Sequence, residues 1–153
     1  MTIQTRELTY ESGGVTFNST MAWDDSLGPR PAVLVAPTWA GSTDFERAQA
    51  LRLAGLGYVG LAVDMYGGGA VGSDKEECTA LMTPVMSDRA MLQARIGAAV
   101  DTIRIQPESV DQPVAAIGFC FGGLCVLDLA RSRQDIAGVV SLHGLLLPAD
   151  NLP

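Results

Sequence analysis

Two short apolar segments place the strongest limit on what this chain can fold into. Residues 31–36 (PAVLVA) and 58–63 (YVGLAV) are continuous apolar runs without a charged side chain. A strand of this kind is buried on both faces, which is typical of a mostly parallel sheet covered by helices on either side. Between the two runs, Thr43 and Glu46 match a capping box, so residues 45–54 are predicted to form a helix.

The remaining segments continue this alternation of strands and helices. Ser73 and Glu76 are expected to cap a helix that runs towards Met82 and that Pro84 interrupts. The other predicted strands are residues 6–10, 15–21, 114–118 and 136–142, and the other predicted helices are residues 88–105 and 120–131. The sequence therefore predicts one α/β domain over residues 1–153, a three-layer sandwich whose mostly parallel sheet begins with an antiparallel hairpin.

Charge and composition narrow the classes of protein that remain. The formal net charge is −7, and there is no surplus of lysine and arginine for phosphate contacts, which argues against a nucleic-acid-binding protein. The apolar stretches are far shorter than the roughly 20 residues that span a bilayer, and the first ten residues do not resemble a signal peptide. Three cysteines are a sparse, odd set that suits a reducing compartment. A cytoplasmic protein that binds neither nucleic acid nor membrane is the expectation.

Residues 118–122 (GFCFG) form the most informative motif. They follow a predicted strand and open a predicted helix, and they match the G-x-S-x-G turn that carries a nucleophilic serine, with Cys120 in the serine position. The spacing has a steric cause, because the turn is so tight that side chains two residues before and after the nucleophile must be absent. The motif places Cys120 outside the carboxyl ends of the strands, where ligands of such sheets bind.

The position of Cys120 at a helix N-terminus also predicts its chemistry. Free backbone N–H groups and the helix dipole favour the thiolate over the thiol, and the Phe121 N–H points to where an oxyanion develops during acyl transfer. The alternative is that Cys120 is a small buried apolar residue in a glycine-rich turn. Cys125, inside the following helix, is expected to belong to the core, and Cys78 has no evident partner.

Four segments together resemble the dienelactone hydrolase family of α/β-hydrolases, over about residues 15–147. They are residues 33–41 (VLVAPTWAG), 53–67 (LAGLGYVGLAVDMYG), 118–123 (GFCFGG) and 139–144 (VVSLHG). The resemblance implies that Cys120 is the nucleophile and that the backbone N–H groups of Phe121 and Trp39 form the oxyanion hole. It also places Thr38 and Trp39 beside the substrate, although Trp39 is interpreted almost equally well as an ordinary core residue.

Two departures from the family pattern bear on the substrate. Members that act on dienelactone resemble one another in having a glutamate where this sequence has Thr38. Residues 67–69 are glycines where an arginine that holds a substrate carboxylate would be expected. The expected substrate is therefore a generic small-molecule ester, thioester or lactone rather than dienelactone itself.

The acid and the histidine of the catalytic triad are the missing part of the pattern. In the family both follow two further strands, so the resemblance implies a chain that lacks its C-terminal part and is truncated after the strand that follows the nucleophile's helix. The only histidine, His143, ends that strand; it is either a substitute base or, as the family pattern favours, a residue bonded to nearby backbone. Asp128 lies mid-helix and Asp135 lies at the wrong end of the last strand, so neither is a good acid.

The truncation that the resemblance implies would leave the strand at residues 136–142 as an open apolar edge of the sheet, and such edges recruit another strand. We therefore expect a homo-oligomer, or a second chain that covers this edge. The alternative to a hydrolase is a non-catalytic fragment, or a structural or interaction subunit that another chain completes.

Cofactor and metal sites are not expected. Residues 67–72 (GGGAVG) match the G-x-G-x-x-G dinucleotide fingerprint, but residues 64–66 separate them from the strand, and no acidic residue ends a strand about 20 residues later. A flexible loop is the preferred interpretation of this segment. A single histidine cannot complete a tetrahedral metal site with the scattered cysteines.

Overall fold

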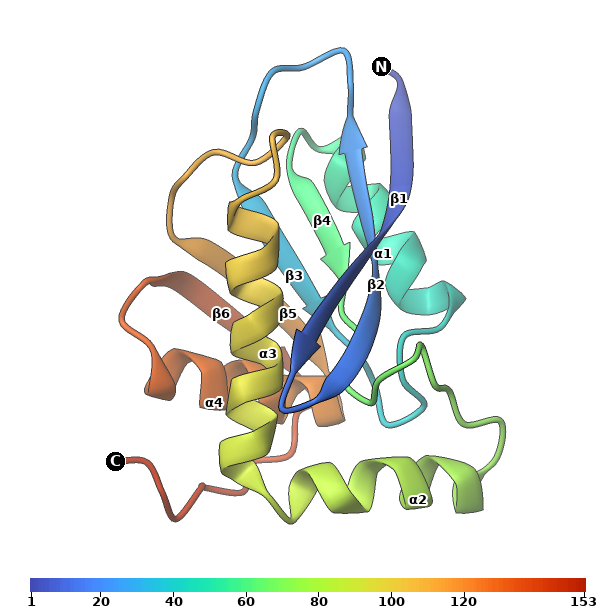
Figure 1. The fold of residues 1–153 in the computed structure, drawn as a ribbon, viewed down its shortest axis with the longest axis vertical. Helices are drawn as coiled ribbons and strands as arrows, with labels where there is room; N and C mark the ends of the chain where they lie inside the picture. The colour runs from blue at the N-terminus through green and yellow to red at the C-terminus, as the bar shows by residue number, and fades with distance from the viewer.

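The computed structural model describes all 153 residues, and it arranges six strands in a single sheet with four helices (Figure 1). The strands are β1 (Ile3–Ser12), β2 (Val15–Asp24), β3 (Ala32–Ala36), β4 (Val59–Ala62), β5 (Val114–Phe119) and β6 (Ile136–Leu142), and the helices are α1 (Asp44–Gly55), α2 (Lys75–Met86), α3 (Arg89–Arg104) and α4 (Phe121–Ser132). The strand order is β1-β2-β4-β3-β5-β6. The pairs β1–β2 and β2–β4 are antiparallel, and β4, β3, β5 and β6 are parallel to one another. The predicted hairpin and mostly parallel sheet are confirmed.

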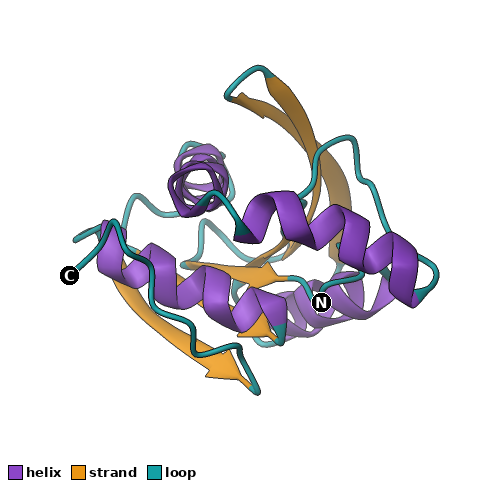
Figure 2. Cartoon of the chain, turned by 90° about the horizontal axis from the view of Figure 1, so that it is seen from below, coloured by secondary structure: helices purple, strands orange, loops and turns teal.

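Helices cover the sheet from both sides (Figure 2). Helix α1 packs on one face, against β2, β3 and β4, while α3 and α4 pack on the other face and against each other. Every residue of β3 and β4 is buried, as the continuous apolar runs predict. Gly60 in β4 permits the close approach of α1, because a Cβ at that position would lie only 2.6 Å from the Ala50 carbonyl oxygen.

The predicted capping box at the start of α1 is confirmed. The Thr43 hydroxyl accepts a hydrogen bond from the Phe45 N–H (3.3 Å), and the Glu46 carboxylate accepts one from the Thr43 N–H (2.8 Å). Helix α2 begins one residue later than the sequence suggests: Asp74, not Ser73, is its N-cap.

The prediction that Pro84 interrupts α2 is wrong, since the helix continues through it to Met86. Proline removes the N–H that would bond to the carbonyl four residues earlier, on Ala80. Both Pro84 and Ala80 are exposed, so water can reach the carbonyl oxygen that loses its partner. The helix also ends within one turn after Pro84, which limits the disruption to a single hydrogen bond.

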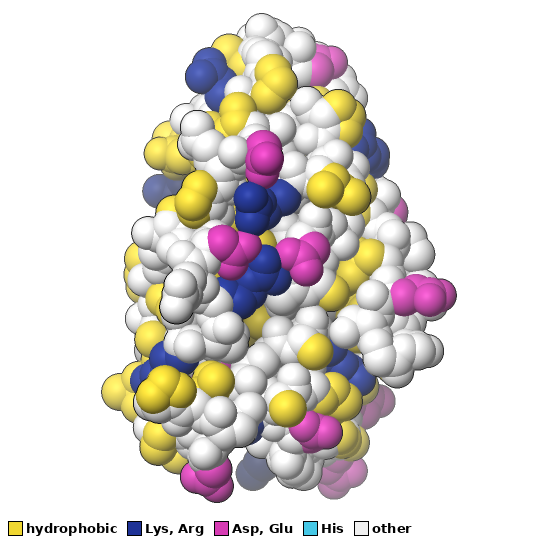
Figure 3. Space-filling model, turned by 60° about the vertical axis from the view of Figure 1, so that its left-hand side comes forward, with side chains coloured by type: hydrophobic (Ala, Val, Ile, Leu, Met, Phe, Trp, Pro, Cys, Tyr) yellow, Lys and Arg dark blue, Asp and Glu magenta, His cyan; other side chains and the backbone are white.

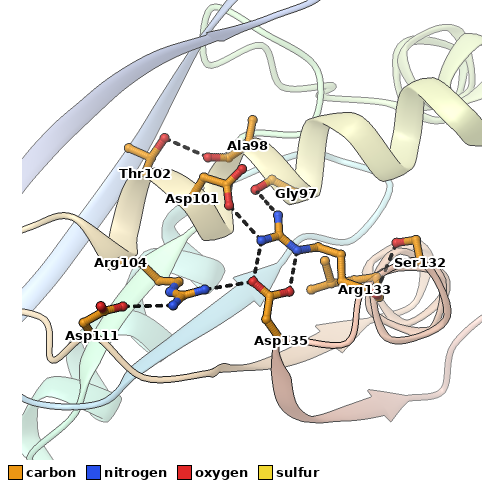
Figure 4. Close-up of polar contacts among 10 residues, drawn as sticks. Gly97, Ala98, Asp101, Thr102, Arg104, Asp111, Ser132, Arg133 and Asp135 are labelled. Atoms are coloured by element: carbon orange, nitrogen blue, oxygen red, sulfur yellow. Dashed lines mark hydrogen bonds and ion pairs between the residues drawn. The ribbon is translucent and has the colours of Figure 1, made fainter.

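Ion pairs fasten the amino end of β6 to helix α3 (Figure 4). The Arg133 guanidinium donates to Asp135 (2.6 Å) and Asp101 (2.8 Å), and Arg104 donates to Asp135 (2.8 Å) and Asp111 (2.9 Å). Hydrogen bonds from Arg133 lower the pKa of Asp135 to about 2. Figure 3 shows acidic and basic side chains interspersed on this side of the molecule. As the sequence predicts, Asp135 lies at the end of β6 opposite Cys120, where its role is structural.

None of the four helices combines the length and the apolar character needed to cross a membrane.

Candidate active site

A single residue, Cys120, forms the turn between β5 and α4. Its backbone angles are φ 57° and ψ −117°, so φ lies in the left-handed region that residues other than glycine rarely adopt. Two hydrogen bonds hold it there: the Cys120 N–H donates to the Leu142 carbonyl (3.0 Å), and its own carbonyl accepts from the Gly123 N–H (2.9 Å). Strained backbone that the surroundings fix in this way is typical of active sites.

The two glycines of the motif have the steric role that the spacing predicts. A Cβ at Gly118 would collide with the Gly122 carbonyl, and a Cβ at Gly122 would collide with the Ala36 and Pro37 backbone. The second contact also shows that the turn presses directly against the end of β3. The loop after β3, which holds Thr38 and Trp39, is therefore brought next to the turn that holds Cys120.

The three cysteines differ sharply in access. Cys120 is half-buried, whereas Cys78 is 4% exposed and Cys125 is fully buried. The full burial of Cys125 confirms the expectation that this cysteine belongs to the core, and it raises the pKa of the thiol well above its usual value. Cys78, for which the sequence offers no partner, packs beneath the backbone of Gly72. Cys120 is the one cysteine of the three that is not buried.

The loop after β3 is held by hydrogen bonds within itself and to α1. The Thr38 N–H donates to the buried Glu46 carboxylate (3.1 Å), and the Thr38 hydroxyl accepts a bond from the Ala40 N–H (3.3 Å). No loop or cap hydrogen bond uses the N–H of Trp39 or that of Phe121. Neither predicted oxyanion donor thus has a partner within the chain, and of the two residues Trp39 is half-buried and Phe121 fully buried.

A buried carboxylate after β4, Asp64, orders the neighbouring glycine-rich segment. It is 2% exposed and accepts hydrogen bonds from the N–H groups of Tyr66 (3.0 Å), Gly67 (2.9 Å) and Gly69 (2.8 Å). Within residues 67–72, predicted from the sequence to be a flexible loop, Gly67 and Gly69 are thus held by one buried carboxylate. The sequence contains a pattern that could have predicted these contacts: an acidic residue directly after a buried strand, followed by glycines whose N–H groups a carboxylate can bind.

Tyr66 is a second residue that the sequence did not single out. Its hydroxyl donates a hydrogen bond to the Trp39 carbonyl (2.7 Å), and its ring stacks on the Phe121 ring with 5.8 Å between centroids. Burial raises the pKa of Tyr66, so the hydroxyl stays protonated and available as a donor. No motif predicts these contacts, because they join two loops and the first residue of α4, which are distant in sequence.

His143 lies at the carboxyl end of β6, beside Cys120 in the fold but not bonded to it. Its imidazole is exposed, stands 6.4 Å from the Phe119 ring between centroids, and makes no hydrogen bond to Cys120, a carboxylate or the backbone. The expected bond to nearby backbone is therefore absent. Asp128 is fully buried and paired with Arg89. The chain thus brings the predicted nucleophile and oxyanion donors together, without an acid–histidine pair beside them.

Comparison with known proteins agrees with this geometry. The sequence profile of the dienelactone hydrolase family matches residues 17–152. The chain belongs to the dienelactone hydrolase family. The match includes the loop after β3, the loop after β4 and the turn at Cys120, so every part of the candidate site lies inside the family's own region.

Two solved structures of this family are similar in both sequence and fold. The protein named m3DLH is 41% identical, with a TM-score of 0.92 over 97% of this chain and 62% of its own. A dienelactone hydrolase-like promiscuous phosphotriesterase from metagenomic libraries is 38% identical, with a TM-score of 0.93 over 99% of this chain and 63% of its own. An uncharacterized Caenorhabditis elegans protein is 45% identical over 69 residues, which are 44% of each chain. The chain therefore spans less than two thirds of the length of these relatives.

Proposed function

We propose that this member of the dienelactone hydrolase family uses Cys120 to attack the carbonyl carbon of a small ester, thioester or lactone. The observation that carries the proposal is the backbone of Cys120, held at φ 57° at the start of α4. Cys120 lies between the last residue of β5 and the first residue of α4, at the carboxyl end of the parallel strands. The N–H groups of Phe121, the first residue of α4, and of Trp39, in the loop after β3, have no partner within the chain.

The chemistry begins with the Cys120 thiolate forming a bond to the carbonyl carbon. The carbonyl electron pair moves to oxygen, and the N–H groups of Phe121 and Trp39 donate to that oxyanion. When the tetrahedral intermediate collapses, the bond to the leaving oxygen or sulfur breaks and the leaving group takes a proton from solvent. A thioester on Cys120 remains, and water must cleave it. Since no imidazole bonds to Cys120, we expect acylation to be faster than this second step.

An uncharged substrate fits the residues after β4 better than a carboxylate. The nearest cation of that region, Arg95, donates to the Met65 carbonyl (2.9 Å) and lies over the Phe17 ring, 5.2 Å from its centroid. Its Nη1 is thus already bonded within the chain, and the glycines at residues 67–69 offer no charged side chain. The phosphotriesterase relative indicates an uncharged phosphotriester as a second substrate type to assay.

The decisive experiment treats the whole chain with p-nitrophenyl acetate at neutral pH. We expect a burst of p-nitrophenolate that approaches about one equivalent per chain, followed by slow turnover, with the acetyl group mapped to Cys120 by peptide mass spectrometry. Buried Cys78 and Cys125 serve as internal controls. Iodoacetamide labelling in parallel is expected to show the same selectivity. Equally slow modification of all three cysteines would overturn the proposal.

A second candidate function, as a subunit of a larger assembly, is favoured by the open edge at β6. This strand pairs only with β5, carries no charged side chain, and exposes Val140 (52%) and Leu142 (38%). We propose that a second copy of the chain pairs its own β6 antiparallel to this edge about a two-fold axis, which continues the sheet across the dimer.

Sedimentation of the purified chain tests this assembly. We expect a species of twice the mass of one chain at micromolar concentration. Val140→Lys places a charge on the exposed face of β6 and is expected to shift the population towards monomer, while Val71→Lys, at an exposed position outside the sheet, is the matched control. A monodisperse monomer of the unaltered chain would contradict the proposal.

A further inference from the structure

One side chain, Tyr66, contacts both halves of the proposed oxyanion hole. Its hydroxyl donates to the carbonyl oxygen of Trp39 (2.7 Å), in the loop after β3. Its ring stacks on Phe121 with an interplanar angle of 17° and 5.8 Å between centroids, at the start of α4. The backbone of Gly41 closes over the same ring, where a Cβ would lie 3.3 Å from it. Tyr66 thus joins the two segments that supply the donors.

Tyr66 is itself held on both sides of its backbone. Its N–H donates to the Asp64 carboxylate (3.0 Å), and its carbonyl accepts from the Arg95 guanidinium (3.4 Å). Arg95 also donates to the preceding carbonyl, on Met65 (2.9 Å). Asp64 is only 2% exposed, so this support is shielded from competing water. The tyrosine therefore has a fixed position from which to orient the loop after β3.

We propose that Tyr66 is a positioning residue for the oxyanion hole: its hydroxyl fixes the Trp39 backbone so that the Trp39 N–H points at the developing oxyanion beside the Phe121 N–H. The inference rests on the proposed function. Without the hydroxyl, the Trp39 carbonyl loses its partner and the peptide on either side of Trp39 can rotate. A displacement of about 1 Å in such a donor can cost on the order of 100-fold in rate.

The test compares two reactions of the same thiol in the whole chain. Acetylation of Cys120 by p-nitrophenyl acetate passes through an oxyanion, whereas alkylation by iodoacetamide displaces iodide and forms none. In Tyr66→Phe, which keeps the stacked ring, we expect the acetylation rate constant to fall at least about 10-fold. We expect the alkylation rate constant to remain within about twofold of the unaltered chain, because the hydroxyl acts on the Trp39 loop rather than on the thiol. The ratio of the two rate constants is the readout.

The control is Tyr58→Phe, since Tyr58 is exposed (42%) and its hydroxyl makes no hydrogen bond within the chain. In this variant the ratio of the acetylation to the alkylation rate constant is expected to be unchanged. Thermal unfolding of each variant shows whether the fold is retained. An unchanged acetylation rate in Tyr66→Phe overturns the inference, and so does an equal fall in both reactions, which would mean that Tyr66 acts on the thiol or on the fold. Failure of the unaltered chain to acetylate Cys120 at all would instead overturn the proposed function.

Discussion

Replacing Cys120 with alanine or glycine is expected to abolish the burst of p-nitrophenolate, and the glycine variant is expected to have a more stable fold than the alanine variant. Both variants remove the sulfur, so neither can form the thioester. They differ in backbone freedom: at φ 57° and ψ −117°, alanine keeps the Cβ that makes this conformation unfavourable, whereas glycine does not. The pair therefore separates the chemical role of the thiol from the strain of the turn.

The expected gain with glycine is modest and its sign can be worked out. A residue held in such a sparsely populated region costs about 1–3 kcal/mol, which glycine relieves. Glycine also makes the unfolded chain more flexible, which costs about 0.5–1 kcal/mol. The net expectation is a gain of about 1 kcal/mol over alanine, or roughly 2–4 °C in the unfolding temperature for a chain of this size.

Differential scanning calorimetry and the p-nitrophenyl acetate assay measure the two effects on the same samples. Cys78→Ala is the matched control, because it removes a buried thiol that lies outside the turn. It is expected to lose stability through a small cavity and to keep its burst. A glycine variant less stable than the alanine variant would show that the turn is not strained, and a burst that survives in both would place the acetyl group elsewhere.

The parts of this molecule that the sequence predicted are those set by local constraints. The turn at Cys120 follows from two glycines within five residues, and the capping box at Thr43 follows from a single turn of helix. The local rule failed at Pro84, because the cost of a proline depends on whether the abandoned carbonyl can reach water. Sequence spacing does not report that exposure.

The supporting contacts of the site could not be predicted for a different reason. The bond from the Tyr66 hydroxyl to the Trp39 carbonyl spans 27 positions, and the bond from the Asn18 N–H to the Asp64 carboxylate spans 46. Such contacts depend on which strands become neighbours, here β2 with β4 and β4 with β3. The order of the strands was not predicted from the sequence, although the parallel arrangement was. His143 shows the same limit: its place at the end of β6 was predicted, but the direction of its side chain was not.

Asp128 marks the largest gap between sequence and structure, because a mid-helix acid gave no sign of its burial. Its side chain is 0% exposed and accepts two hydrogen bonds from Arg89, at 2.6 and 2.8 Å, and one from Gln93 at 3.1 Å. Arg89 stands at the start of α3 and also donates to the Leu147 carbonyl (2.8 Å). The pair therefore fastens together α3, α4 and the segment that follows β6.

Replacing Arg89 with methionine is expected to cause the largest loss of stability of any change considered, about 3–5 kcal/mol, because it removes the hydrogen-bonded cation of a buried carboxylate and leaves only Arg131, 3.8 Å away. The double variant Arg89→Met/Asp128→Leu is expected to recover most of this loss, since an apolar pair of similar volume needs no counter-charge. Urea unfolding measures each free energy. Arg47→Met, which breaks the exposed pair with Asp44, is the matched control and is expected to change little. If the single and the double variants were equally unstable, the loss would come from packing of the Arg89 side chain rather than from the charge left on Asp128.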